Sequence, residues 1–555
     1  MLTADGQVAI VFNGQIYNHL DIRAKLECKG YAFRSTCDTE TLLAAYLEWG
    51  ESCFERLRGM WAVAIWDGRV RKLVISRDRI GLKPLYLFRD GHRLIFASEI
   101  KAILAFAPQA AEMDTLSAYR FLTRAWQDFS ADTFFAGIKA VEPGSVITCH
   151  DGRETASRIW SLTPRPDPDL TIADIRTALI DTVDRHLQSD VPVAVALSGG
   201  VDSGVIACIA ANVLGMRDKL HAFSVTPPDT PDETPWIDAT VRHTGIAHTY
   251  VDTGTVDYES VLDDMLSAQD EPPPKSNHVY QFLLRRHIGL QGFKVLLVGE
   301  GADEIFGGYA KFAPMYLATM LAEGRRAEAR AFLAGAQELA GQSPWRMLMS
   351  MRRMLRTGIG RRTVQEHGFG FELMAPSVAF PTAEAFPELC RAASGAWLHQ
   401  EMMERFLLDM PMVLRIEDRN GMWKSLEVRP PFLDHVLVDT AYRLPQHQLM
   451  KDGVNKWPLR AAVEDVLTPE VARSRVKMRR PGNDSHVVYD NLAGPMRDLL
   501  RSNWFRSIGI FTDGLAQRFD EDRAAKHFHH SFVWFRLYTF GCWYRKYIGS
   551  RASKV

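Results

Sequence analysis

The sequence predicts two successive domains, an α+β domain followed by an α/β domain built on a parallel sheet. Beyond residue 190, short apolar runs with the length of buried strands alternate with helical patterns, which is typical of a parallel sheet flanked by helices. Before residue 162 the pattern differs, because the segments 61–66 and 72–76 form a strand pair joined by an Asp-Gly turn. The parallel strands are expected at 191–197, 220–225, 249–251 and 295–298.

A proline-rich segment separates the two patterns. Residues 163–169 read Thr-Pro-Arg-Pro-Asp-Pro-Asp, and prolines at this density disfavour a helix and extend the chain. With 555 residues, the chain is long enough for more than one hydrophobic core. We therefore expect a first domain over 1–162, a link over 163–170 and a second domain over 171–555.

Composition narrows the class of protein. Lys and Arg total 66 against 67 Asp and Glu, so the net charge of −1 gives no electrostatic reason to bind nucleic acid or an anionic membrane. No apolar run approaches the roughly 18–20 residues of a spanning helix, and we expect no signal peptide. The seven cysteines are scattered without metal-ligand spacing, so we expect reduced thiols and a cytoplasmic location.

A glycine-rich turn follows the first expected parallel strand and leads into a helix. Backbone N–H groups at a helix N-terminus lack partners within the helix, so such a turn favours anionic oxygens such as those of a phosphate. Two hydroxyls add donors, and one carboxylate can hold Mg²⁺. The alternative is an ordinary glycine turn of an α/β protein. The residues of the turn are Leu197, Ser198, Gly199, Gly200, Val201, Asp202 and Ser203.

A second glycine turn, rich in acidic residues, follows the strand at 295–298. It reads Val298-Gly299-Glu300-Gly-Ala-Asp303-Glu. Because parallel strands end at the same edge of a sheet, we expect the two turns to meet there and to bind ATP with Mg²⁺. Asp202 and Asp303 are the candidate Mg²⁺ ligands, since this ion commonly takes one or two carboxylates together with phosphate oxygens. The alternative is a solvated, acidic helix N-terminus.

Several longer motifs occur in a fixed order along the chain. The turn at 198–203 resembles the SGGxDS loop of the ATP pyrophosphatases, which cleave ATP to AMP and pyrophosphate. The other motifs resemble the asparagine synthetase family, and the resemblance covers nearly the whole chain. It implies an N-terminal-nucleophile-type antiparallel sandwich that lacks its first part, and then an ATP-pyrophosphatase α/β domain. The motifs are NGQIYN at 13–18, DTE at 38–40, RDRIGLKPLY at 77–86, FASEIK at 96–101 and the block from Asp418 to Asp434.

The resemblance also implies roles for residues of the second domain. Lys456, in the KxxLR context, corresponds to a lysine that steadies negative charge on the α-phosphate and pyrophosphate, although a lone lysine is usually only solvated. Val225 and Val298 to Glu300 complete the ATP and pyrophosphate site, and Glu300 is the candidate proton acceptor for the attacking ammonium. For Glu427, Arg429 and Asp434 we favour a structural role in a buried turn over direct catalysis.

The first domain matches only part of a glutamine pocket. Asn13 and the Gly14 N–H match the family's oxyanion hole, and Asp38 matches its ligand for the ammonium of glutamine. Gln15 stands where the family usually has Glu. The family's nucleophile is a cysteine at the N-terminus whose own α-amine acts as base, whereas this chain begins with Met1 and Leu2. A start codon set too far downstream is the favoured explanation, with engineered shortening and an ammonia-dependent relic domain as alternatives.

The expected reaction joins ammonia to a carboxylate. The acceptor, aspartate in the family's namesake, attacks the α-phosphorus of ATP, and ammonia then attacks the acyl-adenylate. We expect this chain to use ammonia rather than glutamine. Alternatives are a related amidotransferase or cyclase acting on a secondary-metabolite, sugar or peptide carboxylate, and a non-catalytic scaffold. Glu300 disfavours a β-lactam synthetase, whose family has tyrosine at that turn. A homodimer rests on family analogy alone.

We also predict roles for four further segments. The acidic-proline loop at 270–273, followed by Asn277, resembles a family segment near the acceptor. The segment 475–484 departs from the family pattern and leaves the acceptor's identity open. The methionine-rich helical region at 310–400 is expected to fill a core, and the aromatic segment 534–547 to dock as a helix.

Overall fold

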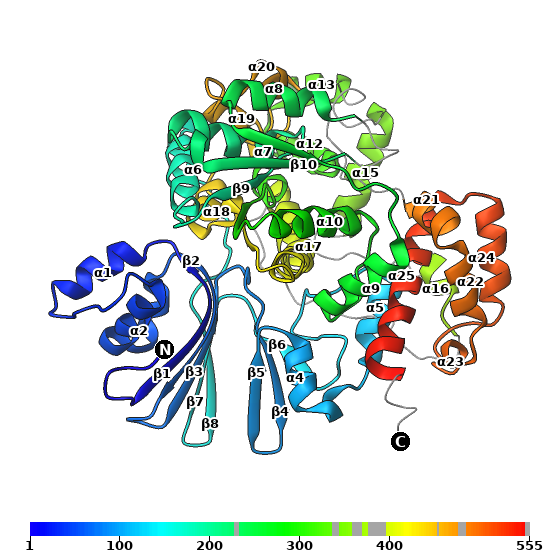
Figure 1. Cartoon of the computed structure of the whole chain (residues 1–555). Helices are drawn as coiled ribbons and strands as arrows, with labels where there is room; N and C mark the ends of the chain where they lie inside the picture. Colours follow the sequence, from blue (N-terminus) through cyan, green and yellow to red (C-terminus); the bar gives the residue numbers. More distant parts are fainter. Residues whose placement is uncertain are drawn as a thin grey trace.

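The computed structural model describes residues 1–226, 232–335, 343–357, 369–375, 396–451, 454–474 and 484–549. Two antiparallel sheets occupy the N-terminal part, and one parallel sheet occupies the following part (Figure 1). The N-terminal elements are β1 (Val8–Ile16), α1 (His19–Glu27), α2 (Asp38–Trp49), α3 (Cys53–Arg56), β2 (Gly59–Asp67), β3 (Lys72–Arg77), β4 (Tyr86–Asp90), β5 (Arg93–Ala97), α4 (Ile100–Phe106), α5 (Thr115–Arg124), β6 (Ile138–Ala140), β7 (Ser145–His150) and β8 (Arg153–Arg158).

The two antiparallel sheets have strand orders β1-β2-β3-β7-β8 and β5-β4-β6. Strand β2 shows why they pack together, because its side chains alternate between two cores. Trp61, Val63 and Ile65 belong to a core shared with α1 and α2, whereas Ala62 and Ala64 belong to a core shared with Leu85 and Leu87 of the second sheet region. The hairpin expected between 61–66 and 72–76 is confirmed, with Trp66 opposite Leu73.

Residues 13–16 have the composition of a turn but lie in a strand. Asn13, Gly14, Gln15 and Ile16 continue β1 instead of forming a turn, because β2 pairs with the strand along its whole length, as far as Ile16 opposite Gly59. Gly14 permits this pairing, since a Cβ atom there would lie 2.1 Å from the Met60 carbonyl oxygen. Close approach of two strands thus explains the glycine.

The second part of the chain contains the parallel sheet. Its order is β11-β10-β9-β12-β13, all neighbours are parallel, and this confirms the alternation seen in the sequence. The elements up to the end of the long helix are α6 (Ile172–His186), β9 (Val193–Ala196), α7 (Val201–Cys208), β10 (Leu220–Val225), α8 (Thr234–Thr244), β11 (Ala247–Val251), α9 (Tyr258–Gln269), α10 (Asn277–Leu290), β12 (Val295–Leu297), α11 (Ala302–Phe306), α12 (Ala313–Ala322), α13 (Arg326–Ala334), α15 (Pro344–Thr357), α16 (Phe369–Glu372) and α17 (Trp397–Met422).

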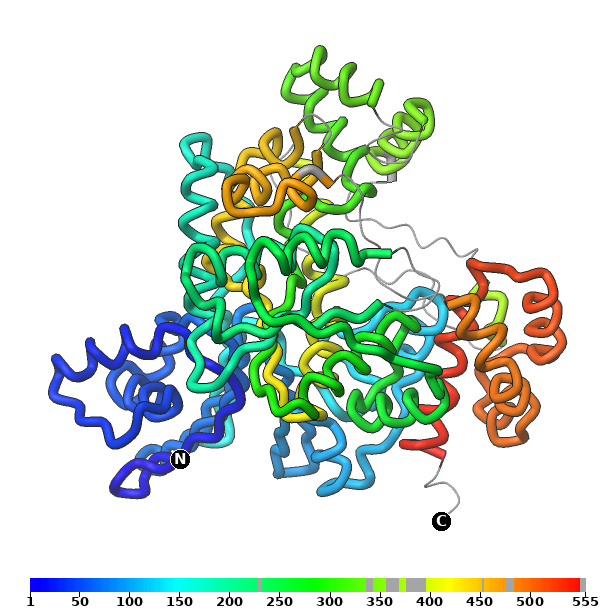
Figure 2. Tube along the Cα trace, turned by 45° about the horizontal axis from the view of Figure 1, so that its top comes forward, coloured from blue at the N-terminus to red at the C-terminus, as the bar shows by residue number. Residues whose placement is uncertain are grey.

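The remaining elements complete the sheet and extend to the far side of the molecule. Helices α22 to α25 lie on the opposite side from α1 and α2 in both views (Figures 1 and 2). These elements are β13 (Glu427–Arg429), α18 (His435–Ala441), α19 (Trp457–Ala462), α20 (Pro469–Arg473), α21 (Asp484–His486), α22 (Ala493–Arg501), α23 (Asn503–Arg506), α24 (Leu515–Ala524) and α25 (Phe528–Tyr544).

Helix α25 docks as the aromatic pattern indicated. Trp534 and Trp543 are fully buried in a core that also includes Phe121 of α5. The methionine pattern gave a mixed result, because Met315 and Met347 are buried whereas Met349 of α15 is 47% exposed. Among the described residues, no helix is both long and apolar enough to cross a membrane.

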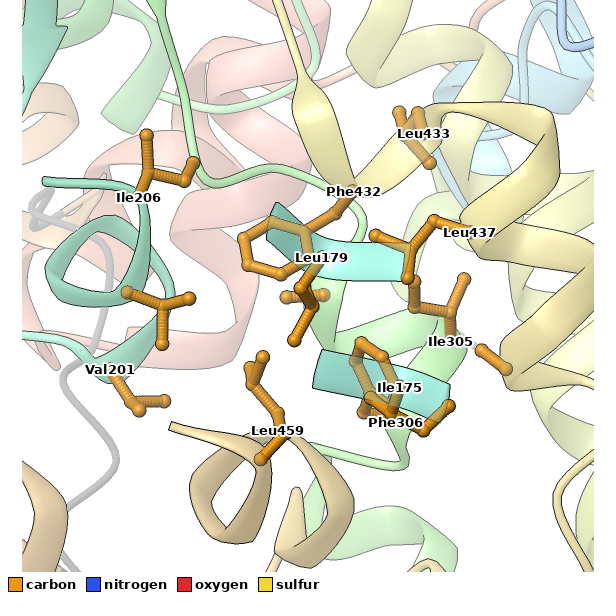
Figure 3. Packing of buried hydrophobic residues seen from close by; sticks show 14 of the residues in the cluster. Ile175, Leu179, Val201, Ile206, Ile305, Phe306, Phe432, Leu433, Leu437 and Leu459 are labelled. Carbon is orange, nitrogen blue, oxygen red and sulfur yellow. The ribbon is translucent and has the colours of Figure 1, made fainter. Parts of the chain in front are cut away.

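One hydrophobic core holds together the helices that follow the glycine turns. Val201 and Ile206 of α7, Ile305 and Phe306 of α11 and Leu459 of α19 all belong to it, and Figure 3 shows their side chains converging. Each of these helices begins at or beside one of the polar residues singled out in the sequence. The core therefore fixes the relative positions of those polar residues.

Candidate active site

The turn at 197–203 connects β9 to α7 at the carboxyl edge of the parallel sheet. Helix α7 begins at Val201, so Asp202 and Ser203 lie in its first turn, and the expected later helix start was wrong. The hydroxyls of Ser198 and Ser203 lie 3.0 Å apart, and the Gly200 N–H donates to the Ser198 hydroxyl over 3.2 Å. Backbone N–H groups and two hydroxyls therefore meet in one small turn, which is a suitable arrangement for an anion.

The second glycine turn packs directly on the first. A Cβ atom on Gly299 would lie 3.0 Å from the Asp202 Cβ and 3.1 Å from the Ser203 nitrogen. Gly301 has φ +98°, and a side chain there would meet Leu433 at 2.4 Å. The conformation of Gly301 favours glycine, and a side chain on Gly299 would require its neighbours to shift, so this close approach places Glu300 and Asp303 beside the first turn.

Lys456 joins the two turns. Its ammonium lies 2.7 Å from both carboxylate oxygens of Asp202 and 2.9 Å from Asp303 Oδ1. It precedes α19 with φ 54°, a left-handed conformation that costs free energy for a residue other than glycine. Gly308 makes room for it, since a Cβ atom there would lie 2.1 Å from the Lys456 Cε and 1.9 Å from Asp303 Oδ1.

The electrostatic balance keeps Lys456 charged. Burial favours the neutral amine and alone would lower the pKa of Lys456, but the attraction of Asp202 and Asp303 outweighs it and the net shift is upward. A charged ammonium, two carboxylates and the donors of the first turn thus share one site. Such a site can balance the charges of a triphosphate.

The two carboxylates suit a magnesium ion. Both lie within 3 Å of the same Lys456 nitrogen, so they are placed to share a single cation. Among the described residues, no group of three or more His, Cys, Asp or Glu side chains gathers as a metal site. Two carboxylates with further positions left to water and phosphate are the usual setting for Mg²⁺ rather than for a metal held by protein ligands alone.

Val225, Leu197 and Val298 lie at the carboxyl ends of three adjacent strands. Val225 is the last residue of β10, which pairs with β9, and β9 in turn pairs with β12. The Leu197 N–H donates to Phe223 and the Val298 N–H donates to Arg429, so both positions extend the ladder past the strand ends. The structure therefore brings all residues expected for the nucleotide site to one edge.

A small cavity extends from Glu300 towards the first domain. It measures about 10 Å³, enough for one small molecule such as water or ammonia, and Leu82 of the first domain lines it. Beside it, Lys83 Nζ donates to Asp418 Oδ1 at 2.9 Å, and both side chains are almost completely buried. Sequence reasoning missed this ion pair, although Lys83 and Asp418 both stand within motifs that it had singled out.

The residues expected for the glutamine pocket lie apart from the nucleotide site. Asn13 Nδ2 donates to Ser98 Oγ at 3.2 Å, and Asp38 Oδ2 accepts from the Ile16 N–H at 2.9 Å. Asp38 is the first residue of α2, and its side chain does not cap the helix. These contacts join Asn13 and Asp38 to the frame of the first domain.

Gln15 reaches the second domain. Its Oε1 accepts from Arg429 Nη2 at 3.5 Å. Arg429 also donates to Glu427 Oε1 at 2.7 Å and to the carbonyls of His186 and Gln188. Asp434 accepts from Arg58 Nε and from the Val436 N–H at the start of α18. The contacts of Glu427, Arg429 and Asp434 are those of residues that hold segments together.

The acidic-proline loop is buried between the domains. Asp270 is fully buried and accepts from the Lys101 N–H, while Glu271 accepts from the Phe134 N–H at 2.8 Å and pairs with Arg415 at 3.3 Å. These contacts give the loop a structural environment. Most of the segment 475–484 lies outside the described residues, and its last residue, Asp484, accepts from the Ser276 N–H.

The fold and the site define a two-part enzyme with an amidotransferase-like first part and a nucleotide site in the second. The family model of the glutamine amidotransferase domain matches residues 1–160, and that of asparagine synthase matches residues 174–545. The chain therefore belongs to the asparagine synthase family, and it is a ligase that carries out ATP-dependent amidation.

Similar proteins include three asparagine synthetases of Bacillus subtilis strain 168. The glutamine-hydrolyzing asparagine synthetase 3 is 30% identical over 83% of this chain and 74% of its own length, and asparagine synthetase 1 is 27% identical over 89% and 79%. Amidase chyE of Penicillium rubens is 28% identical over 84% of this chain and 76% of its own length. Relatives at 27–30% identity thus include both asparagine synthetases and a protein named as an amidase.

Solved structures match more weakly. The glutamine phosphoribosylpyrophosphate amidotransferase of B. subtilis in complex with ADP and GMP is 16% identical over 45% of this chain and 47% of its own, with a TM-score of 0.21. No argument rests on that likeness.

Proposed function

We propose that this ligase activates a carboxylate, most simply that of aspartate, as an acyl-adenylate and that ammonia then converts the adenylate to an amide. AMP and pyrophosphate are the other products. The single observation that supports this most is the convergence of the anion-binding turn, Glu300 and the triad of Asp202, Asp303 and Lys456 at one sheet edge. We further propose that the first part is an N-terminal-nucleophile-type sandwich and that the second part is an ATP-pyrophosphatase domain.

The first step needs stabilisation of negative charge. As the acceptor oxygen attacks the α-phosphorus, charge grows on the phosphate oxygens and on the departing pyrophosphate. The N–H groups of the 198–203 turn and the two serine hydroxyls donate to these oxygens. Lys456 moves from the carboxylates to the phosphates as pyrophosphate leaves. Fixed charges in a site that excludes water are worth more than the same charges in solution.

Magnesium fits this step. Asp202 and Asp303 would hold it, and when bound it neutralises the triphosphate and withdraws electrons from the phosphorus. Both carboxylates then exchange their ammonium partner for the metal.

The second step needs a proton acceptor near the adenylate. Glu300 belongs to the turn beside Asp202 and lines the small cavity, so ammonia passing Leu82 would reach Glu300 first. Its carboxylate takes a proton from the attacking nitrogen, and AMP departs. We propose free ammonia as the nitrogen donor, because the small cavity beside Glu300 has room for a molecule of that size.

The second candidate function is that of a related amidotransferase or cyclase that acts on a carboxylate other than that of aspartate. The similarity to an amidase from Penicillium rubens supports this candidate. A non-catalytic scaffold is disfavoured, since a scaffold has no need for a strained lysine between two carboxylates. The glutamine pocket (Asn13, Gly14, Asp38), the homodimer and the cytoplasmic location stay predictions.

Isotope exchange between pyrophosphate and ATP tests the proposal. With Mg²⁺ and aspartate, the purified chain should catalyse exchange, and amide should form when ammonium chloride is added. Exchange with another acid but not with aspartate would select the second candidate. No exchange with any of a panel of amino, sugar and peptide acids would contradict both. Amide formation from glutamine, without free ammonia, would contradict the ammonia dependence.

A further inference from the structure

Glu233 contacts the proposed phosphate-binding turn, and nothing in the sequence indicated this contact. Its carboxylate Oε2 accepts a hydrogen bond of 2.9 Å from the Gly199 N–H. Gly199 belongs to the group of backbone donors that the proposed function assigns to phosphate oxygens. A protein carboxylate therefore uses a donor that a nucleotide phosphate would need, and one N–H hydrogen cannot serve both anions with good geometry.

The backbone around Glu233 fixes this contact. A Cβ atom on Gly199 would lie 3.1 Å from the Glu233 Cβ and 3.2 Å from both the Glu233 carbonyl oxygen and the Trp236 Cβ. Trp236 packs against the large core beneath the turn. The start of α8 thus lies close to the glycine turn, and this closeness brings the Glu233 carboxylate within reach of the Gly199 N–H.

The Glu233 carboxylate is partly withdrawn from water. Burial raises its pKa, and the hydrogen bond from Gly199 opposes this shift only in part. A negative charge so placed repels a triphosphate as well as occupying its donor.

We propose that Glu233 is an internal competitor of the nucleotide: its carboxylate must leave the Gly199 N–H before a phosphate oxygen can bind there, so Glu233 sets the affinity of the site for ATP. This inference rests on the proposed function, which makes the 198–203 turn the phosphate site. Glu233 is a positioning residue and takes no part in the chemical steps.

Lys456 is the matching cation. It lies between the two carboxylates proposed for Mg²⁺, as Glu233 lies on the donor proposed for phosphate. Nucleotide and metal then take over the contacts of two internal partners, an anion and a cation, and both partners stay in the protein. The practical consequence is that removing the charge of Glu233 alone should make the site bind nucleotide more tightly.

Equilibrium binding of α,β-methylene-ATP with excess Mg²⁺ tests this, since the analogue is not cleaved to pyrophosphate and no acceptor is required. Isothermal titration calorimetry would compare the full-length chain with Glu233→Gln, which keeps an oxygen that can accept from Gly199 but removes the charge. A repulsion of about 1 kcal/mol in a half-exposed site corresponds to about fivefold tighter binding for the variant. In turnover, KM for ATP should fall by the same factor with kcat unchanged.

Asp232→Asn is the matched control. Asp232 is the neighbouring acid, exposed, and its Oδ1 accepts from the Thr234 N–H at 2.9 Å, so asparagine can keep that contact. It removes the same charge without touching Gly199, and its affinity should stay within twofold of the unsubstituted chain.

The outcomes separate the two proposals. Tighter binding by Glu233→Gln but not by Asp232→Asn supports the competitor. Equal or weaker binding by Glu233→Gln, or equal gains in both variants, overturns it and leaves the proposed function intact. Nucleotide binding without pyrophosphate exchange for any acid overturns only the proposed reaction. No nucleotide binding by any of the three proteins overturns both.

Discussion

The proposed nucleotide site and the residues expected to form a glutamine pocket are held in place in different ways. In the nucleotide site, Asp202, Asp303 and Lys456 come from three segments far apart in sequence and contact one another directly. In the glutamine pocket, Asn13 and Asp38 contact a serine hydroxyl and a backbone N–H of the same domain. Charged side chains hold the first site together, whereas strand β1 and its neighbours hold the second.

This difference predicts how each region responds to change. In the proposed nucleotide site both Asp202 and Asp303 pair with Lys456, so removing the lysine leaves two carboxylates unbalanced. The glutamine pocket keeps its shape as long as the sheet persists. Between them, Lys83 and Asp418 tie the two parts through a buried ion pair. Substitutions at each place can therefore test this difference between the two regions.

The largest effect is expected for Lys456→Met. Loss of the ammonium leaves Asp202 and Asp303 facing each other and removes charge stabilisation at the phosphates, so pyrophosphate exchange should fall by about 10²–10³-fold. Lys451→Met is the control, because Lys451 is exposed and lies near the Trp457 ring. Similar losses in both variants would show that the contact with the carboxylates is not what matters.

Gly308→Ala should act on the same site without changing any charge. The added methyl group overlaps Asp303 Oδ1 and Lys456 Cε, so both must shift, and a displacement of this size should lower kcat/KM by about tenfold to hundredfold. Gly494→Ala in α22, where a Cβ meets nothing within 4 Å, is the control. Full activity of Gly308→Ala would mean that the site tolerates a wider spacing than the contacts indicate.

Lys83→Met tests the tie between the two parts. It leaves the buried Asp418 carboxylate without its partner, which should cost about 3–5 kcal/mol of the free energy of unfolding. The double variant Lys83→Met with Asp418→Leu should recover part of this loss. Lys29→Met breaks a half-exposed pair with Glu48 and should cost less than about 1 kcal/mol. Equal costs for Lys83→Met and Lys29→Met, measured by thermal and denaturant unfolding, would refute the buried tie.

The smallest effect is a pH dependence at Glu271, which contacts Phe134 of the first part and Arg415 of the second. Burial raises the pKa of Glu271 from 4.5 to about 7, so between these values the folded chain holds a proton that the unfolded chain has lost. This contribution to stability is complete below pH 4.5 and is lost as the pH rises towards 7, by up to about 3 kcal/mol. Glu271→Gln should lack it. Parallel pH profiles of the unfolding midpoint for both proteins would contradict the assignment.

Most of the second part could be predicted from the sequence, because its signals are local. A strand followed by glycines and a helix start already indicates an anion site, and β9, β10 and β12 lie within the segments expected to be strands. The first part was harder. Residues 13–16 have the composition of a turn, but pairing with β2 extends the strand through them. A partner strand 43 to 49 positions away overrides a local preference.

The partners of the buried charged side chains could not be predicted from the sequence. Lys83 and Asp418 stand in recognisable motifs, yet nothing in either motif says that one pairs with the other across 335 positions. Glu233 follows no motif at all and reaches Gly199 only because α8 packs against the core beside the turn. Side-chain partners of this kind depend on how whole elements are packed.

By itself the sequence determined the order of the domains, the parallel sheet and the residue types of the nucleotide site. Periodicity, glycine turns and proline act over a few residues and so can be seen in the chain. Only the tertiary structure decided that Lys456 bridges Asp202 and Asp303, that Glu233 occupies the Gly199 donor and that Lys83 locks the two parts together. Coulomb interactions and close packing depend on distance in space, which residues far apart in the chain acquire only when the core brings their elements together.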